Sequence, residues 1–178
     1  PGEFRLLEAA APGEPGDGQA LVRVRRIGIC GTDLHAFDGS QPFFDYPRIL
    51  GHELGVEIVA VGENTLGLKP GDSCAVEPYL CCGQCVACSR GKTNCCADMQ
   101  VLGVHIDGGM QEYILLPASK LLKSETLSFE QLALVETLGI GAHALVQAGL
   151  QPQEPILVVG AGPVGMSIVA SGRAAGHE

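Results

Sequence analysis

Apolar and polar residues alternate over short stretches in the first two-thirds of the chain. Within residues 20–30, the apolar positions Val22, Val24 and Ile27 are interspersed with charged residues, as in a strand with one buried face. Turn residues or glycine flank further β-branched or apolar runs within residues 55–62, 69–76 and 108–117. This part of the chain is therefore predicted to be β-rich.

A helical periodicity replaces this alternation further along. Residues 127–150 have apolar residues at helical spacing, with Ser128 as N-cap, Gln131 in the capping-box position and Gly149 as the stop. Residues 154–178 then predict a buried strand, a glycine turn and a helix of small residues. The change of pattern predicts a boundary between two domains between about residues 115 and 155.

Composition and charge narrow the class of protein. With 46% hydrophobic and 17% charged residues, the chain is typical of a globular fold. Its formal net charge of −9 argues against nucleic acid or an anionic membrane as a partner, because phosphate groups would repel it. No run of apolar residues is long enough to predict a transmembrane helix, and the first residues carry no apolar signal core. A cytoplasmic location is therefore expected.

Six of the eight cysteines fall within sixteen consecutive residues. Cys82, Cys85 and Cys88 have the spacing that lets thiolates wrap one small soft cation, and on spacing alone Cys95 or Cys96 supplies the fourth sulfur. An iron–sulfur cluster is less favoured, because the bacterial ferredoxin pattern has a shorter last gap followed by proline. Disulfides are less favoured in a chain with no signal segment that is large enough to bury a core. The pattern favours a closed zinc site, which stabilises a loop without catalysing.

Further candidate metal ligands are scattered along the chain, at Cys30, His52, Glu53 and Glu136. Taken singly, such residues are more often a small buried thiol, a satisfied core or turn histidine and a surface carboxylate. Because these residues occur together upstream of a glycine-rich turn, the sequence favours a joint role over separate ones.

The glycine-rich turn follows the apolar run ILVV and precedes the last predicted helix. Its residues are Gly160, Gly162, Pro163, Val164 and Gly165. After a strand and before a helix, this pattern favours dinucleotide binding, because it brings backbone N–H groups and a helix N-terminus to a pyrophosphate. The acidic residue that distinguishes NAD(H) from NADP(H) is expected about 20 residues further on, so both cofactors stay open. The chain is expected to be a fragment, or the ordered part, of a longer enzyme.

The segments GICGTDLH, PRILGHE, CGQCVACSRGKTNCC, VLGVHIDGGMQEY and VVGAGPVG together resemble zinc-dependent medium-chain alcohol and polyol dehydrogenases. The resemblance is strongest to the bacterial branch near threonine 3-dehydrogenase, sorbitol and L-idonate dehydrogenases and L-galactonate oxidoreductases. It implies an α/β two-domain fold with a GroES-like β-barrel catalytic domain followed by the start of a Rossmann domain. The implied ranges are 1–125 for the catalytic domain with a zinc lobe at 81–96, 126–153 for a helical connection and 154–178 for the incomplete Rossmann domain.

The same resemblance implies two zinc ions per chain. It assigns the structural zinc to Cys82, Cys85, Cys88 and Cys96. It assigns the catalytic zinc to Cys30, His52 and Glu136, with Glu53 alternating between a ligand and a neighbour of the ligands.

A proton relay is also implied by the resemblance, with Thr32 as its first hydroxyl and His35 as its surface end. Asp33 is interpreted as the partner that orients His52. One departure from the family motif is Val56, which occupies the position of a usual glycine and is preceded by Gly55, so the packing behind the metal loop is expected to differ.

The predicted function is hydride transfer from a secondary alcohol of a polyol, sugar acid or hydroxy-amino acid to NAD(P)+. The predicted partners are a small-molecule alcohol and further copies of the chain in a tetramer or dimer, with no nucleic acid and no membrane. Two alternatives stay open: a primary-alcohol or aldehyde dehydrogenase of the same superfamily, and a non-catalytic zinc-stabilised binding module. Arg48, His105 and His143 could pair with a substrate carboxylate or phosphate, but the favoured interpretations are a solvated arginine, a loop-shaping histidine and a helix-packed one.

Overall fold

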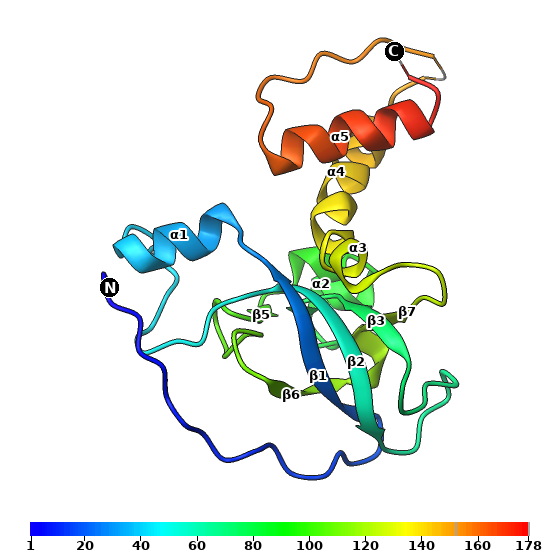
Figure 1. The fold of residues 1–178 in the computed structure, drawn as a ribbon. Coiled ribbons are helices and arrows are strands. Elements are labelled where there is room, and N and C mark those ends of the chain that lie inside the picture. Colours follow the sequence, from blue (N-terminus) through cyan, green and yellow to red (C-terminus); the bar gives the residue numbers. More distant parts are fainter. Residues whose placement is uncertain (152, 178) are drawn as a thin grey trace. The chain divides into compact units, whose positions relative to one another are not determined.

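The computed structural model describes residues 1–151 and 153–177 and has two compact units, Pro1–Ala133 and Leu134–Glu178 (Figure 1). The strands of the first unit are β1 (Gln19–Gly28), β2 (Glu53–Val61), β3 (Ser73–Val76), β4 (Tyr79–Leu80), β5 (Gln100–Val101), β6 (Tyr113–Pro117) and β7 (Leu121–Lys123). Its helices are α1 (Gly31–Asp38), α2 (Val86–Ser89), the short 3-10 turns η1 (Thr93–Cys95) and η2 (Ala118–Lys120), and α3 (Phe129–Ala133). The second unit holds α4 (Val135–Ala148) and α5 (Pro163–Ala174).

An antiparallel sheet of five strands, in the order β6-β1-β2-β3-β7, forms the centre of the first unit, and β4 pairs with β5 separately. The four predicted strands correspond to β1, β2, β3 and β6, so these predictions are confirmed. Figure 1 shows β1 and β2 side by side as the two longest strands. Their pairing brings the end of β1 next to the start of β2, where candidate metal ligands lie.

A β-bulge explains the uneven spacing of apolar residues in β1. Val24 pairs with Val56 and Arg26 pairs with Gly55, so one extra residue is accommodated between them. Ile27 therefore packs against the core although it follows Val24 at an odd interval. The core itself consists of buried aliphatic side chains from the five-stranded sheet and the loops around it.

Packing explains why Val56 stands at the position of the usual glycine and why Gly55 precedes it. Val56 is fully buried in the core. Gly55 lies against the backbone of α3, because a Cβ added there would lie 3.1 Å from the carbonyl carbon of Phe129 and would overlap its oxygen. The glycine therefore lets α3 approach the sheet closely, while the valine fills the interior.

The predicted helical stretch 127–150 forms two helices, α3 and α4, which divide at Leu134. The predicted capping box is confirmed, because the backbone N–H of Ser128 donates to Gln131 Oε1 at 2.9 Å and that of Gln131 donates to Ser128 Oγ at 3.3 Å. Gly149 ends α4 with φ of 63°, as predicted. None of the helices in the described residues is long and apolar enough to cross a membrane.

The buried strand predicted before the glycine turn is not formed, so this prediction is wrong for the structure described. Residues 155–160 have no strand assignment, and the side chains of Leu157 and Val159 are 89% and 90% exposed. A strand needs a neighbouring strand for its backbone hydrogen bonds, and none pairs with this segment in the described residues. The predicted domain ranges stay predictions, and positions 152 and 178 within them lie outside the described residues.

Candidate functional site

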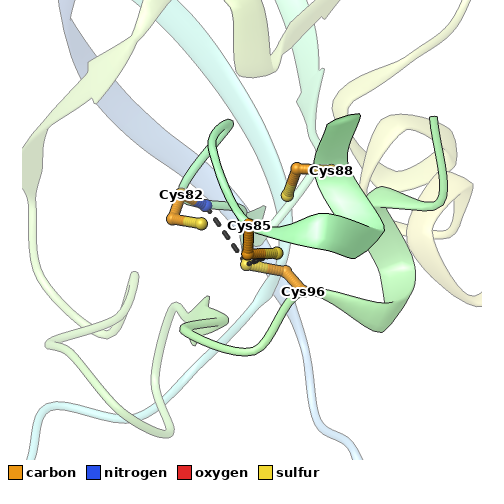
Figure 2. A group of neighbouring side chains, drawn as sticks. All are labelled: Cys82, Cys85, Cys88 and Cys96. Atoms are coloured by element: carbon orange, nitrogen blue, oxygen red, sulfur yellow. Dashed lines mark hydrogen bonds between the residues drawn. The ribbon is translucent and has the colours of Figure 1, made fainter. Parts of the chain in front are cut away.

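Four cysteine sulfurs converge in the lobe between β4 and β5. The Sγ atoms of Cys82, Cys85, Cys88 and Cys96 all lie within 4.8 Å of one another. Figure 2 shows their side chains directed toward a common centre, with the backbone N–H of Cys82 donating to the sulfur of Cys96 at 3.3 Å. The short helix α2 begins just after Cys85 and includes Cys88, so one helical turn places these two sulfurs on the same side.

The donor set fits zinc. Four sulfurs about 2.3 Å from a tetrahedral zinc lie about 3.8 Å from one another, and the Sγ atoms of Cys85 and Cys96 are 4.0 Å apart. All eight cysteines are free, so no disulfide competes for these sulfurs. Cys95 is exposed and lies outside the converging group, whereas Cys96 belongs to it. The assignment of the four as ligands of a structural zinc stays a prediction.

The thiols of this group influence one another's protonation. Backbone N–H groups of Ala97 and Cys88 lower the pKa of the Cys85 thiol to about 6. Burial and the neighbouring thiols of Cys85 and Cys96 raise the pKa of the Cys88 thiol to about 12. Four thiolates this close repel one another unless a cation lies between them, so a divalent metal is the natural partner of the fully ionised set.

A second group combines Cys30, His52 and Glu53, whose ligand atoms also lie within 4.8 Å of one another. His52 and Glu53 are buried, at 6% and 8% exposure, and Cys30 is half-buried. The antiparallel pairing of β1 with β2 explains the convergence, because Cys30 comes just after β1 and His52 just before β2. A sulfur, an imidazole nitrogen and a carboxylate are donors that suit a catalytic zinc and leave room for an outside ligand.

Gly28 provides the space for the Glu53 carboxylate. The two residues pair across β1 and β2, and a Cβ added to Gly28 would lie 2.9 Å from Glu53 Cβ and would overlap Oε2. Sequence reasoning missed this glycine, because its role depends on the strand register. The only available signal was a glycine at the end of a β-strand pattern.

Asp33 ties the two chain segments of this group together. Its carboxylate accepts a hydrogen bond from the backbone N–H of Cys30 at 2.9 Å and another from that of Gly51 at 3.2 Å. Its Oδ1 also lies 4.0 Å from Nδ1 of His52, and the residue is 3% exposed. The interpretation of Asp33 as a residue that orients its neighbours is compatible with these contacts. The nearby His52 ring lowers the pKa of the Cys30 thiol, an effect that outweighs burial.

The predicted relay residues both lie on α1. Thr32 Oγ1 is 3.7 Å from the Cys30 sulfur, and His35 follows on the next turn of the helix. The His35 side chain is exposed, with Nδ1 3.3 Å from Ser40 Oγ. Glu136 lies half-buried in the first turn of α4, in the second unit. The roles assigned to Thr32, His35 and Glu136 stay predictions.

The glycine turn lies in the second unit and leads directly into α5. Gly160 has φ of 105°, a conformation that side chains disfavour, and Gly162 and Pro163 are the N-cap and first residue of the helix. A Cβ on Gly165 would lie 3.0 Å from the carbonyl carbon of Gly160. The turn therefore requires small residues at its contact points, and Val164 lies exposed at its outer side. Its role in binding a cofactor stays a prediction.

Of the interpretations given to two basic residues, one is confirmed and the other is wrong. His105 shapes its loop, as favoured, because its Nδ1 accepts from the backbone N–H of Val101 at 3.1 Å. Arg48 is not solvated, because its side chain is only 16% exposed and Nη1 contacts Asp107 Oδ1 at 3.2 Å. The contact partner lies 59 residues away in sequence, so spacing gave no indication of the pair.

Comparisons with known proteins identify the family of this chain. The family model of the alcohol dehydrogenase GroES-like domain matches residues 16–126. The chain belongs to the zinc-dependent medium-chain dehydrogenases. L-galactonate-5-dehydrogenase of Escherichia coli is 49% identical over 92% of this chain and 48% of its own length. Sorbitol dehydrogenase of Bacillus subtilis is 40% identical over 89% of this chain and 46% of its own length.

Solved structures give the same result. An alcohol dehydrogenase from Escherichia coli, complexed with the cofactor NADH, superposes with a TM-score of 0.90 at 36% identity, covering 99% of this chain and 51% of that one. The predicted family and the predicted fold class are thereby confirmed. The chain spans about half the length of the curated relatives it matches.

Proposed function

We propose that the protein to which this chain belongs is a zinc-dependent oxidoreductase that transfers hydride from a secondary alcohol to NAD(P)+. The alcohol loses a hydride to the nicotinamide and a proton to the protein, and becomes a carbonyl compound. The observation that carries the proposal is the buried convergence of Cys30, His52 and Glu53 beside a threonine hydroxyl. A protein that needed only its cysteine lobe for stability would have no use for this second donor set.

The residues around the second group have complementary tasks in this proposal. A zinc ion held by Cys30, His52 and Glu53 would act as a Lewis acid on an alcohol oxygen and lower its pKa. Thr32, whose hydroxyl lies 3.7 Å from the Cys30 sulfur, would accept the alcohol proton. His35, exposed on the same helix, would pass that proton on to water. Glu136 is proposed as a further ligand on the strength of the family resemblance.

The proposed substrate class is a polyol, a sugar acid or a hydroxy-amino acid. It is supported by the names of the relatives, of which one acts on L-galactonate and another on sorbitol. The proposed cofactor site is the turn at Gly160, Gly162, Pro163, Val164 and Gly165, and the NADH-bound relative supports a nicotinamide cofactor. We further propose two zinc ions per chain, a homo-oligomer and a cytoplasmic location, the last favoured by eight free thiols.

Metal analysis tests the proposal directly. The parent chain, Cys30→Ser and Cys88→Ser are each purified, treated with a mild chelator and analysed for zinc. Two zinc ions per parent chain and one in each variant are expected, because each substitution removes a sulfur from a different group. One zinc in the parent and in Cys30→Ser alike would contradict the proposal and favour a zinc-stabilised binding module.

The activity is then tested on the whole protein. Polyols, sugar acids, hydroxy-amino acids and primary alcohols are supplied with NAD+ or NADP+, and cofactor reduction is followed by absorbance. Turnover of secondary alcohols that falls at least about 100-fold in Cys30→Ser supports the proposal, in line with the size of acid–base and metal contributions to catalysis. Preference for primary alcohols would support the alternative dehydrogenase.

A further inference from the structure

Loop 103–110 lies directly against the segment that leads into His52. Three backbone N–H groups of the loop donate to consecutive carbonyls of the segment: Gly108 to Ile49 at 2.7 Å, Met110 to Leu50 at 2.9 Å and Gly109 to Gly51 at 2.8 Å. The last of these carbonyls belongs to the residue just before His52. A displacement of the loop would therefore be transmitted to the histidine backbone.

The approach is close because glycines meet at the contact. A Cβ on Gly103 would lie 2.8 Å from the nitrogen of Gly51, and one on Gly108 would lie 2.6 Å from the Cα of Gly103. Gly51 itself has φ of 93°, which a side chain would disfavour. Backbone therefore packs directly on backbone at Gly103 and Gly108, which leaves little room for a shift there.

Asp107 fixes this contact from the loop side. Its Oδ1 accepts from the backbone N–H of Ile49 at 3.1 Å and lies 3.2 Å from Nη1 of Arg48. The Nε of Arg48 is buried and has no hydrogen-bond partner in the described residues. The guanidinium pairs with the carboxylate of Asp107 through Nη1. Removing the anion beside a mostly buried cation costs folding free energy. The Arg48 side chain would then shift toward water and move residues 48–51 with it.

A second carboxylate, from a residue that precedes the segment in sequence, also holds it. Asp33 accepts from Gly51, two residues beyond the N–H that Asp107 engages, and it also holds Cys30. The segment is thus fastened at Ile49 by Asp107 and at Gly51 by Asp33. Of the two, Asp107 engages Ile49 and Arg48, which are not candidate metal ligands, so it can be altered without removing a donor from the group.

We propose that Asp107, through Arg48 and Ile49, is a positioning residue that sets the orientation of His52 in the metal group. This inference rests on the proposed function, since it assumes that Cys30, His52 and Glu53 hold a metal. It predicts that Asp107 controls the affinity of that group and leaves the cysteine lobe unaffected.

The test is a chelator competition on the zinc-loaded parent, Asp107→Ala and Asp107→Asn. Cys30→Ser and Cys88→Ser identify which zinc belongs to which group. Glu130→Gln is the control for the loss of a carboxylate–arginine pair, because Glu130 Oε1 lies 2.7 Å from Nε of Arg26, whose side chain is exposed, unlike that of Arg48. Cobalt replacement gives a second readout, since the difference in thiolate–cobalt absorption between a variant with and without Cys30→Ser reports the geometry around Cys30.

Asp107→Ala is expected to weaken the Cys30-group metal about 10–100-fold, the usual effect of losing a residue that orients metal ligands. Asp107→Asn keeps the acceptor for Ile49 and loses only the charge, so a smaller weakening is expected, while Glu130→Gln matches the parent. The inference is overturned if Asp107→Ala also matches the parent, or if both metals weaken equally. A parent that binds a single zinc would instead overturn the proposed function, and this inference with it.

Discussion

Replacing Gly28 with alanine should expel the Glu53 carboxylate from the second metal group. Gly28, the last residue of β1, pairs with Glu53, the first residue of β2, so the new methyl group points at the glutamate side chain. The carboxylate oxygen that the methyl would overlap can rotate away. The Cβ of Glu53 cannot rotate, because it is fixed to the backbone of β2.

The size of the conflict follows from the distances. The added Cβ would lie 2.9 Å from Glu53 Cβ and 3.0 Å from Cδ, whereas ordinary contacts begin near 3.4 Å. The strands must therefore separate locally by about 0.5 Å, and the side chain must leave its rotamer. Overpacking of this kind costs about 1–3 kcal/mol in the free energy of unfolding. Removal of one carboxylate donor should also weaken metal binding by the Cys30 group.

Gly31→Ala is the matched control, because Gly31 is next to Cys30 and a Cβ there meets no atom within 4 Å. As the first residue of α1, it should tolerate alanine and gain about 0.4–1 kcal/mol in the free energy of unfolding. Urea unfolding and zinc affinity are measured for both variants and the parent. If Gly28→Ala kept parental stability and parental affinity at the Cys30 group, the placement of Glu53 against Gly28 would be wrong.

Three further predictions use other parts of the first unit. Cys88→Ser should lose one zinc per chain, whereas Cys95→Ser should keep both, because only Cys88 belongs to the converging sulfurs; elemental analysis decides, and equal zinc loss in both variants would contradict the grouping. Burial raises the pKa of Asp72, but hydrogen bonds from a backbone N–H and from Lys123 outweigh it and hold that pKa below its usual value. A lowered carboxyl pKa contributes stability above the unfolded-state pKa and loses it as the pH falls, so Lys123→Gln should be destabilised at pH 7, and the deficit should shrink below about pH 4, as unfolding titrations at several pH values would test. Ser128→Ala should cost about 0.5–2 kcal/mol in chemical unfolding by removing the α3 cap, and no change would mean that the cap is not formed in solution.

Alternation was sufficient to predict β1, whose burial alternates in its first half, and apolar runs beside turn residues predicted β2, β3 and β6. Burial in β2 does not follow a period of two, because its first four residues are all buried. Even the irregular spacing between Val24 and Ile27 fits once the bulge is taken into account. The prediction of a strand before the glycine turn was wrong because a strand also needs neighbouring strands. The apolar residues of this segment would suit a buried strand, but backbone pairing comes from neighbouring strands, and Leu157 and Val159 are exposed without them.

The two groups of candidate metal ligands differ in how well the sequence alone predicts them. The cysteine lobe is local, since all four sulfurs come from fifteen consecutive residues and one turn of helix brings two of them together. The second group depends on a register between strands that sequence does not state, so only a family pattern could join Cys30 to His52 in advance. Asp107 and Gly28 lay beyond either kind of inference. Asp107 contacts the backbone of Ile49 and the side chain of Arg48. Gly28 acts by having no side chain, which leaves space for the Glu53 carboxylate. Residues of this kind do no chemistry and carry no motif, yet in this arrangement they fix where the donors lie, so substitutions at both sites are the sharpest tests of the proposed catalytic metal.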